Sequence, residues 1–288
     1  MTTAGAHTVA IVSPLGGTGC TTLAAHLATL MAVHGRACLA VDLCAQNLLG
    51  RHLGLQQPAE AGWAGLAAQQ QWWGQAALRN SQGVDLLPFG AASAEVLDTL
   101  QRACLHKPEW LRQQLDALDV PPGSVLVLDA PTWPAPLARQ ALAAADTVVV
   151  VLDASARACQ AQALVSHTLA GAPAGAHCAI AINRTDPRRP SQRSALQALR
   201  SQWADLLLPY TVHEDENLAQ ACEHATSVCA WAPHAQSSHD LQGIGQWLAE
   251  RLPAMPAAGL PAPVPSPLLP PPALPEAVPA PAPLEQQP

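Results

Sequence analysis

Ser13-Pro14-Leu15-Gly16-Gly17-Thr18-Gly19-Cys20-Thr21-Thr22 is the stretch of sequence that decides the fold. An apolar run at residues 8–12 precedes it, and an Ala- and Leu-rich stretch at residues 23–33 follows it. A short buried strand, a glycine-rich turn and a helix start form the usual setting of a phosphate-binding loop, or P-loop. The three glycines let the backbone approach a phosphate closely, and Thr21 stands where a P-loop holds Mg²⁺. The usual P-loop lysine is absent, because position 20 is Cys.

Outward from this loop, strand-like and helix-like segments alternate along most of the chain. The expected strands are residues 8–12, 37–42, 84–89, 124–129, 146–153, 177–183 and 206–212. The expected helical segments are residues 23–33, 60–79, 94–118, 191–204, 215–225 and 240–252. This alternation, with strands that are apolar throughout, predicts an α/β fold: a P-loop NTPase-like, mainly parallel sheet with helices on both faces.

The chain divides by composition near residue 252. Residues 1–252 carry the alternating pattern and are expected to form one nucleotide-binding domain. In residues 253–288, 14 of 36 residues are Pro, mixed with Ala and Leu. Such a segment cannot form regular hydrogen-bonded structure, so we expect a disordered tail that leans toward polyproline II.

Charge and apolarity limit the classes of partner. The formal net charge is −7 and only 12% of residues are charged, which argues against direct binding of nucleic acid or of an anionic membrane. We recognise no signal peptide and no stretch of about 18–20 apolar residues that would span a bilayer. Eight cysteines without zinc-ligand spacing indicate reduced thiols, so a cytoplasmic protein without an intrinsic membrane anchor is expected.

Two carboxylates stand at the ends of apolar strands. Asp42 and Asp129 would lie at the sheet edge where open α/β folds place ligands. Facing a glycine-rich loop, they indicate Mg²⁺ binding and the positioning of a water molecule around a nucleotide. Either aspartate alone would be interpreted as the cap of a strand end. The loop and both aspartates together favour a nucleotide site.

Three further features each have two interpretations. Asn183 ends an apolar strand and could recognise a purine edge, or could form the turn before residues 184–187. Residues 213–216, His-Glu-Asp-Glu, could bind a metal, but an acidic start to the following helix is favoured. Cys20 could be a reactive thiol at a helix N-terminus, but a small space-filling residue is favoured.

These motifs resemble those of the ParA/MinD ATPases. Residues 16–22, GGTGCTT, resemble their deviant Walker A motif, K-G-G-x-G-K-[ST]-[ST]. Asp42 with Gln46 and Asn47 is similar to the D-x-D-P-Q element of the second strand, and residues 129–131 are similar to the Walker B motif. Within that superfamily, residues 62–64, 85–90 and 207–216 resemble the BcsQ-type proteins of bacterial cellulose secretion. The resemblance covers roughly residues 8–252.

The resemblance implies roles for individual residues. The residues implied in nucleotide binding are Gly16, Gly17, Thr18, Gly19, Cys20, Thr21, Thr22 and Asn183. Of these, Thr22 would reach the α-phosphate and Asn183 would hold adenine. Thr21, together with Asp129 partly through water, would bind Mg²⁺. Asp42 would be the catalytic residue that positions the attacking water.

The sequence departs from the family pattern at three charged positions. Leu15 replaces the lysine that family dimers insert into the partner's site, and Cys20 replaces the lysine at the β- and γ-phosphates. Cys44 replaces the second aspartate of the strand element. A cation supplied in trans is worth about 10³- to 10⁵-fold in phosphoryl transfer, so hydrolysis should suffer more than binding. Arg157, at the start of a helix, is a candidate source of charge near a dimer interface.

The function that the resemblance implies is an ATP-binding accessory protein of bacterial cellulose biosynthesis and secretion. It would act with Mg²⁺ as a homodimeric scaffold or positioning factor for the membrane synthase, with hydrolysis weak or lost. Other secretion subunits would recruit it to the inner membrane. An active ParA/MinD-type partition or polar-positioning ATPase is the alternative, and a scaffold that binds no nucleotide is a third possibility.

Overall fold

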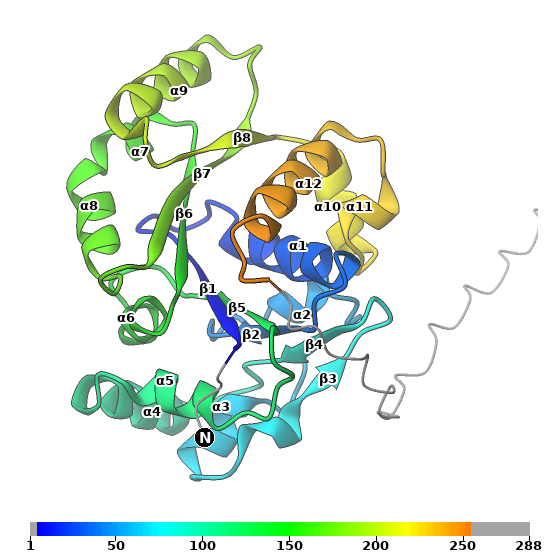
Figure 1. The fold of residues 1–288 in the computed structure, drawn as a ribbon, viewed down its shortest axis with the longest axis vertical. Helices are drawn as coiled ribbons and strands as arrows, with labels where there is room; N and C mark the ends of the chain where they lie inside the picture. The colour runs from blue at the N-terminus through cyan, green and yellow to red at the C-terminus, as the bar shows by residue number, and fades with distance from the viewer. Residues whose placement is uncertain (1–4, 255–288) are drawn as a thin grey trace, which may run out of the picture.

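Eight strands form a single sheet in the computed structural model, which describes residues 5–254 (Figure 1). The strands are β1 (His7–Val12), β2 (Cys38–Asp42), β3 (Leu78–Arg79), β4 (Val84–Leu87), β5 (Val125–Asp129), β6 (Thr147–Asp153), β7 (His177–Thr185) and β8 (Leu207–His213). Their order across the sheet is β3-β4-β2-β5-β1-β6-β7-β8. Every neighbouring pair is parallel except β3 and β4, so the expected mainly parallel sheet is confirmed.

Helices cover both faces of this sheet, as the alternating pattern predicts (Figure 1). One face carries α1 (Cys20–Val33), α2 (Leu49–His52), α10 (Glu216–Glu223), α11 (Val228–Trp231) and α12 (Gln236–Ala249). The other face carries α3 (Trp63–Ala68), the short 3-10 helix η1 (Trp73–Ala76), α4 (Ala94–His106), α5 (Trp110–Asp116), α6 (Pro136–Ala143), α7 (Ala156–Gln160), α8 (Gln162–Ala170) and α9 (Pro190–Trp203).

The central strands are apolar throughout because both of their faces are buried. In β1, Val9 and Ile11 pack on the side of α1, whereas Ala10 and Val12 pack on the opposite side, and all four are fully buried. Burying one such aliphatic side chain contributes roughly 1.5–3 kcal/mol to stability for the larger residues. The two cores therefore fix the register of the strands whose ends carry the candidate site.

Two segments differ from the sequence-based prediction on one face of the sheet. Residues 60–79 are not one helix: α3 ends at Ala68, Gln70 takes a left-handed conformation with φ of 56°, and η1 and β3 follow. Residues 94–118 divide into α4 and α5. Pro108 lies between these helices, where its missing N–H and its restriction of the preceding residue oppose a continuous helix.

The last described helix also begins earlier than predicted. α12 begins at Gln236 rather than at Asp240, and Leu252 beyond its end is still buried. The expected disordered tail lies outside the described residues, apart from Pro253 and Ala254. None of the helices within residues 5–254 has the length and apolarity needed to cross a bilayer.

The strand order brings the predicted site residues to one edge of the sheet. β5 lies between β1 and β2, so the carboxyl ends of these three strands are adjacent. In this register Asp129 is paired with Asp42 on one side and with Ile11 on the other. The P-loop follows β1 directly and therefore lies beside both aspartates.

Candidate nucleotide-binding site

The P-loop is shaped by two glycines in left-handed conformations. Gly17 has a φ of 77°, and Gly19, which is the N-cap of α1, has a φ of 95°. A Cβ atom at Gly19 would overlap the Nδ2 atom of Asn183, so this position has no room for a side chain. The turn delivers the chain into α1, whose first N–H groups have no partners within the helix and favour an anion.

Asn183 joins strand β7 to the P-loop. Its Nδ2 donates to the Thr18 carbonyl at 2.7 Å, and its Oδ1 accepts from the backbone N–H of Arg184 at 2.9 Å. The side chain is 8% exposed and lines the cavity beside the loop. These bonds give Asn183 a positioning role in the structure, and its contact with adenine stays a prediction.

Two arginines, one on α7 and one at the carboxyl end of β7, bring positive charge to the P-loop. Arg184 donates from Nη1 to the Gly17 carbonyl at 2.9 Å. Arg157 donates from Nη2 to the Gly16 carbonyl at 3.3 Å and lies 3.4 Å from Asp153. The sequence predicts a role for Arg157 only near a dimer interface and predicts none for Arg184. The signal available for Arg184 was its place directly after Asn183, at the carboxyl end of β7.

Asp42 is fully buried and rigidly held at the end of β2. Its Oδ1 accepts from the N–H of Cys44 at 2.9 Å, and its Oδ2 accepts from the N–H of Leu49 at 3.0 Å. Its carbonyl accepts from the indole Nε1 of Trp63 at 2.7 Å. Burial raises the pKa of the carboxyl to about 6, although the two N–H donors act in the opposite direction.

Asp129 differs from Asp42 because its carboxylate is buried without partners. The side chain is fully buried, and within residues 5–254 neither oxygen accepts a hydrogen bond of regular geometry. Burial raises its pKa well above the usual range, and neighbouring Asp42 raises it further, whereas Thr21 and Cys44 lower it. A buried carboxylate of this kind requires a proton or a cation. Its place beside the Thr21 hydroxyl fits the Mg²⁺ that the P-loop resemblance implies.

For Cys20 and for residues 213–216, the structure supports the interpretation without a reactive thiol or a bound metal. Burial, and then the charge of Asp129, raise the pKa of Cys20 to about 12, which opposes a reactive thiolate. Asp215 caps α10 by accepting from the N–H of Asn217 at 2.9 Å. His213 lies 2.8 Å from Asp240 rather than in a metal-ligating group with Asp215. The acidic segment therefore serves as a helix start.

A cavity of about 670 Å³ lies over these residues, within the range of about 300–1,000 Å³ that is usual for small-molecule sites. It is lined by the P-loop, Gln46, Asn183, Arg184 and residues 213–216, among others. A second cavity of about 720 Å³ lies near His7, at the opposite edge of the sheet, away from the P-loop. The cavity over the P-loop is thus the candidate ligand site of the described residues.

Comparison with known families and sequences gives a consistent result. The family model described as cellulose biosynthesis protein BcsQ matches residues 7–249. The BcsQ protein of Salmonella typhi is 29% identical over 234 residues, which cover 81% of this chain and 90% of the relative. The BcsQ protein of Escherichia coli K12 is 29% identical over 237 residues, with the same two coverages.

Solved structures share the fold at lower sequence identity. The septum site-determining protein MinD of Pyrococcus horikoshii, complexed with Mg-ADP, has a TM-score of 0.68 and 20% identity. The alignment covers 84% of this chain and 96% of the MinD chain. Cobyrinic acid a,c-diamide synthase of Mycobacterium smegmatis, with a bound ATP analogue and magnesium, has a TM-score of 0.67 and 18% identity. That alignment covers 88% of this chain and 100% of the synthase chain. These likenesses establish a ParA/MinD-like fold.

Proposed function

Because this chain belongs to the BcsQ family of cellulose biosynthesis proteins, we propose that it is an ATP- and Mg²⁺-binding accessory protein of bacterial cellulose secretion. The observation that carries the proposal is the partnerless carboxylate of Asp129 beside Thr21, at the start of a glycine-shaped P-loop. Two solved proteins of the same fold contain magnesium with ADP or an ATP analogue, which supports the choice of ligand.

In this proposal the phosphates lie on the P-loop, where they accept from the first N–H groups of α1. Thr21 and Asp129 hold Mg²⁺, the latter partly through water, and Mg²⁺ neutralises phosphate charge when it is bound. Thr22 contacts the α-phosphate and Asn183 the adenine. Asp42 is held by two backbone N–H groups, and so it is positioned to orient a water molecule at the same edge.

We expect hydrolysis to be weak. Leu15 and Cys20 are neutral where family ATPases carry lysines, and transition-state charge in phosphoryl transfer is met by cations. Arg157 and Arg184 supply positive charge, but each is bonded to a P-loop carbonyl. The neutral positions disfavour an active partition ATPase. We therefore infer a nucleotide-bound homodimer that positions the membrane synthase from the cytoplasmic side.

Calorimetric titration with ATP and Mg²⁺ tests the nucleotide site. Thr21→Ala removes the hydroxyl next to Asp129 and should abolish the dependence of ATP binding on Mg²⁺. Thr99→Ala is the matched control, because Thr99 is exposed on α4 and bonds only the carbonyl of Glu95. A wild-type protein that binds no ATP, or a Thr21→Ala protein that binds like wild type, contradicts the proposal.

Restoring the two lysines tests the inference about hydrolysis. We expect Cys20→Lys to tighten ATP binding modestly and to leave phosphate release slow, because position 15 still lacks a cation. Only Leu15→Lys combined with Cys20→Lys should raise turnover clearly, and only at protein concentrations where dimers form. Full turnover of the Cys20→Lys monomer would show that no cation from a partner subunit is needed.

A further inference from the structure

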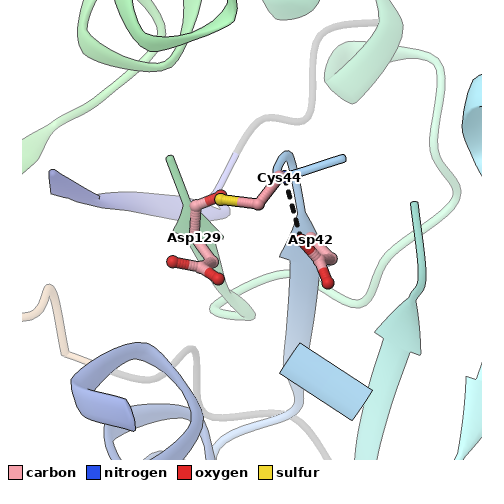
Figure 2. Close-up of side chains that lie close together, drawn as sticks. All are labelled: Asp42, Cys44 and Asp129. Carbon is pink, nitrogen blue, oxygen red and sulfur yellow. Dashed lines mark hydrogen bonds between the residues drawn. The ribbon is translucent and has the colours of Figure 1, made fainter. Parts of the chain in front are cut away.

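Asp42, Cys44 and Asp129 form a cluster of potential metal ligands at the carboxyl edge of the sheet (Figure 2). One ligand atom from each residue lies within 4.8 Å of the corresponding atoms of the other two. Asp42 and Asp129 end the neighbouring strands β2 and β5, and Cys44 follows two residues after the end of β2. Two of the three ligands therefore lie on strands of the sheet, and the third lies in the loop that directly follows β2.

The charge of this cluster is not balanced within the described part of the chain. No ion pair found among residues 5–254 includes Asp42 or Asp129. Both oxygens of Asp129 are buried and lack partners, whereas Asp42 is already satisfied by two N–H groups. Two adjacent buried carboxylates repel each other unless a proton or a cation lies between them. The orphaned Asp129 is thus a second observation, beyond the cluster itself, that indicates a cation.

The thiol of Cys44 determines which cation suits the cluster. Mg²⁺ takes oxygen ligands and is poorly served by sulfur, whereas Zn²⁺ and Co²⁺ accept thiolate together with carboxylate. Cys44 now donates weakly to the Asp129 carbonyl, with 3.5 Å between sulfur and oxygen. This bond is weak, because a thiol is a weak donor. Burial, and then Asp129 and Asp42, raise the pKa of the Cys44 thiol, so a bound cation has to displace the thiol proton, as zinc does when a thiol coordinates it.

We propose that Asp42, Cys44 and Asp129 form a binding site for a thiophilic divalent cation, Zn²⁺ being the physiological example, with a fourth position left for water or an anion. The site is distinct in its chemistry from Mg²⁺ held by Thr21, because it uses the cysteine that this chain carries in place of an aspartate. The two sites share Asp129, so the two cations exclude each other at this edge. The cluster needs no nucleotide and is therefore tested without one, and Cys44, which the proposed ATP site does not use, separates the two proposals.

Titration of the full chain with Co²⁺ under reducing conditions, without nucleotide, tests the site. One equivalent should produce the near-ultraviolet charge-transfer band of a cobalt–thiolate bond, and Cys44→Ser should remove that band. Cys222→Ser is the matched control, because the Cys222 sulfur lies 3.8 Å from Nε2 of His52 and is the competing thiol site. Loss of the band in Cys222→Ser with retention in Cys44→Ser would overturn the proposal, as would the absence of any band.

Calorimetry with Zn²⁺ and Mg²⁺ gives an independent measurement. Outer-shell partners alone are worth about 10- to 100-fold in metal affinity, so loss of the Cys44 ligand should weaken Zn²⁺ binding at least about tenfold. Cys44→Asp restores an oxygen ligand and should shift the preference from Zn²⁺ toward Mg²⁺. Retained circular dichroism and a thermal transition separate ligand loss from misfolding. A Cys44→Asp protein with unchanged Zn²⁺ preference would contradict the assignment.

Discussion

Position 19 requires glycine for two reasons, its backbone conformation and the space beside it. Its φ of 95° lies in the region that residues with a side chain avoid, and its missing side chain leaves space for the Asn183 amide. That amide in turn donates to Thr18 within the same loop. The loop shape and the position of β7 are therefore coupled through the absence of one methyl group.

We expect Gly19→Ala to destabilise the protein by more than the roughly 1–2 kcal/mol of left-handed backbone strain alone. Gly35→Ala is the matched control, because Gly35 has a φ of 77° and open space where its Cβ would be. Chemical denaturation of both variants measures the difference. Equal losses in the two variants would mean that the contact with Asn183 contributes nothing.

At the residue scale, the sequence predicts which residues belong to the candidate site better than it predicts which residues bond to one another. The glycines and the strand-end aspartates were predictable because strand periodicity places them at one sheet edge. The bond from Trp63 to Asp42 spans 21 residues, and the bond from Arg184 to Gly17 spans 167. Neither follows from local pattern, because the partners meet only through the packing of separate elements. For the same reason Cys44 was recognised as a substitution but not as a potential metal ligand.

At the scale of elements, α3 is docked on the segment after β4 by backbone contact. The N–H of Trp63 donates to the Pro88 carbonyl at 3.0 Å, and a Cβ atom at Gly62 would overlap the backbone of Phe89 and Gly90. Trp63 stacks on Trp73 with their ring centroids 4.6 Å apart. The two sequence motifs at residues 62–64 and 85–90 are thus two sides of one contact.

Gly62→Ala should weaken this contact by about 1–3 kcal/mol, the usual cost of forcing an extra carbon into a packed site. Gly65→Ala is the control in the same short segment, since a Cβ atom there meets nothing within 4 Å. It should be neutral or stabilising by about 0.5–1 kcal/mol, because it adds a helix former. The free energy of unfolding is the measurement, and similar values for the two variants would contradict this account of the docking.

His26 connects α1 to α11 as a buried neutral ring. Its Nε2 accepts from the N–H of Val228 at 2.9 Å, so the proton is assigned to Nδ1, which donates to the Thr22 carbonyl at 2.7 Å. Burial lowers its pKa, and the ring of His52 faces it at 6.2 Å. The pKa of His52 is itself lowered to about 4 by burial, and then by His26 and Arg51.

The lowered pKa of His26 gives stability a defined pH dependence. Below about pH 6.5 His26 is protonated in the unfolded chain but stays neutral in the folded chain. The free energy of unfolding therefore falls by up to about 1.4 kcal/mol for each unit by which the pH is lowered. His26→Gln should be less stable than wild type by about 1–3 kcal/mol at neutral pH. That gap should narrow as the pH falls toward 5, because only the wild type loses the histidine contribution.

Denaturation of wild type and His26→Gln at matched pH values measures the gap, and titrations common to both proteins, such as those of the aspartates, cancel. His34→Gln, at the exposed end of α1, is the control and should stay within about 0.5 kcal/mol of wild type. A gap that is constant or widens on acidification would show that His26 is not kept neutral by the fold.

Among the elements, long apolar strands were predicted well and irregular segments poorly. The strands at residues 124–129 and 146–153 are buried on both faces, so their composition alone identifies them. The prediction of one helix over residues 60–79 was wrong because Trp and Ala in that segment pack into the core from separate short elements, and not from one face of a single helix. Trp63 and Trp73 face the same aromatic cluster from two separate turns.

At the scale of the whole molecule, the folded unit extends slightly beyond the predicted boundary at residue 252. Leu252 is buried, and the carbonyl of Pro253 accepts from Arg36 Nη2 at 2.8 Å. We therefore expect a chain that ends at Ala254 to unfold at the temperature of the full-length protein. A chain that ends at Arg251 should lose roughly 1.5–3 kcal/mol with Leu252. Calorimetry of the three lengths decides this, and a lowered transition in the chain ending at Ala254 would assign a structural role to residues 255–288.

The insertion of β5 between β1 and β2 also determines when the site can exist during synthesis. β1, the P-loop and Asp42 leave the ribosome well before residues 125–129, and the domain can close only after β5 has entered between the two earlier strands. A nascent chain without β5 has a P-loop and one aspartate, but lacks the strand that joins them. Any ligand of this edge therefore selects completed molecules and cannot guide their early folding.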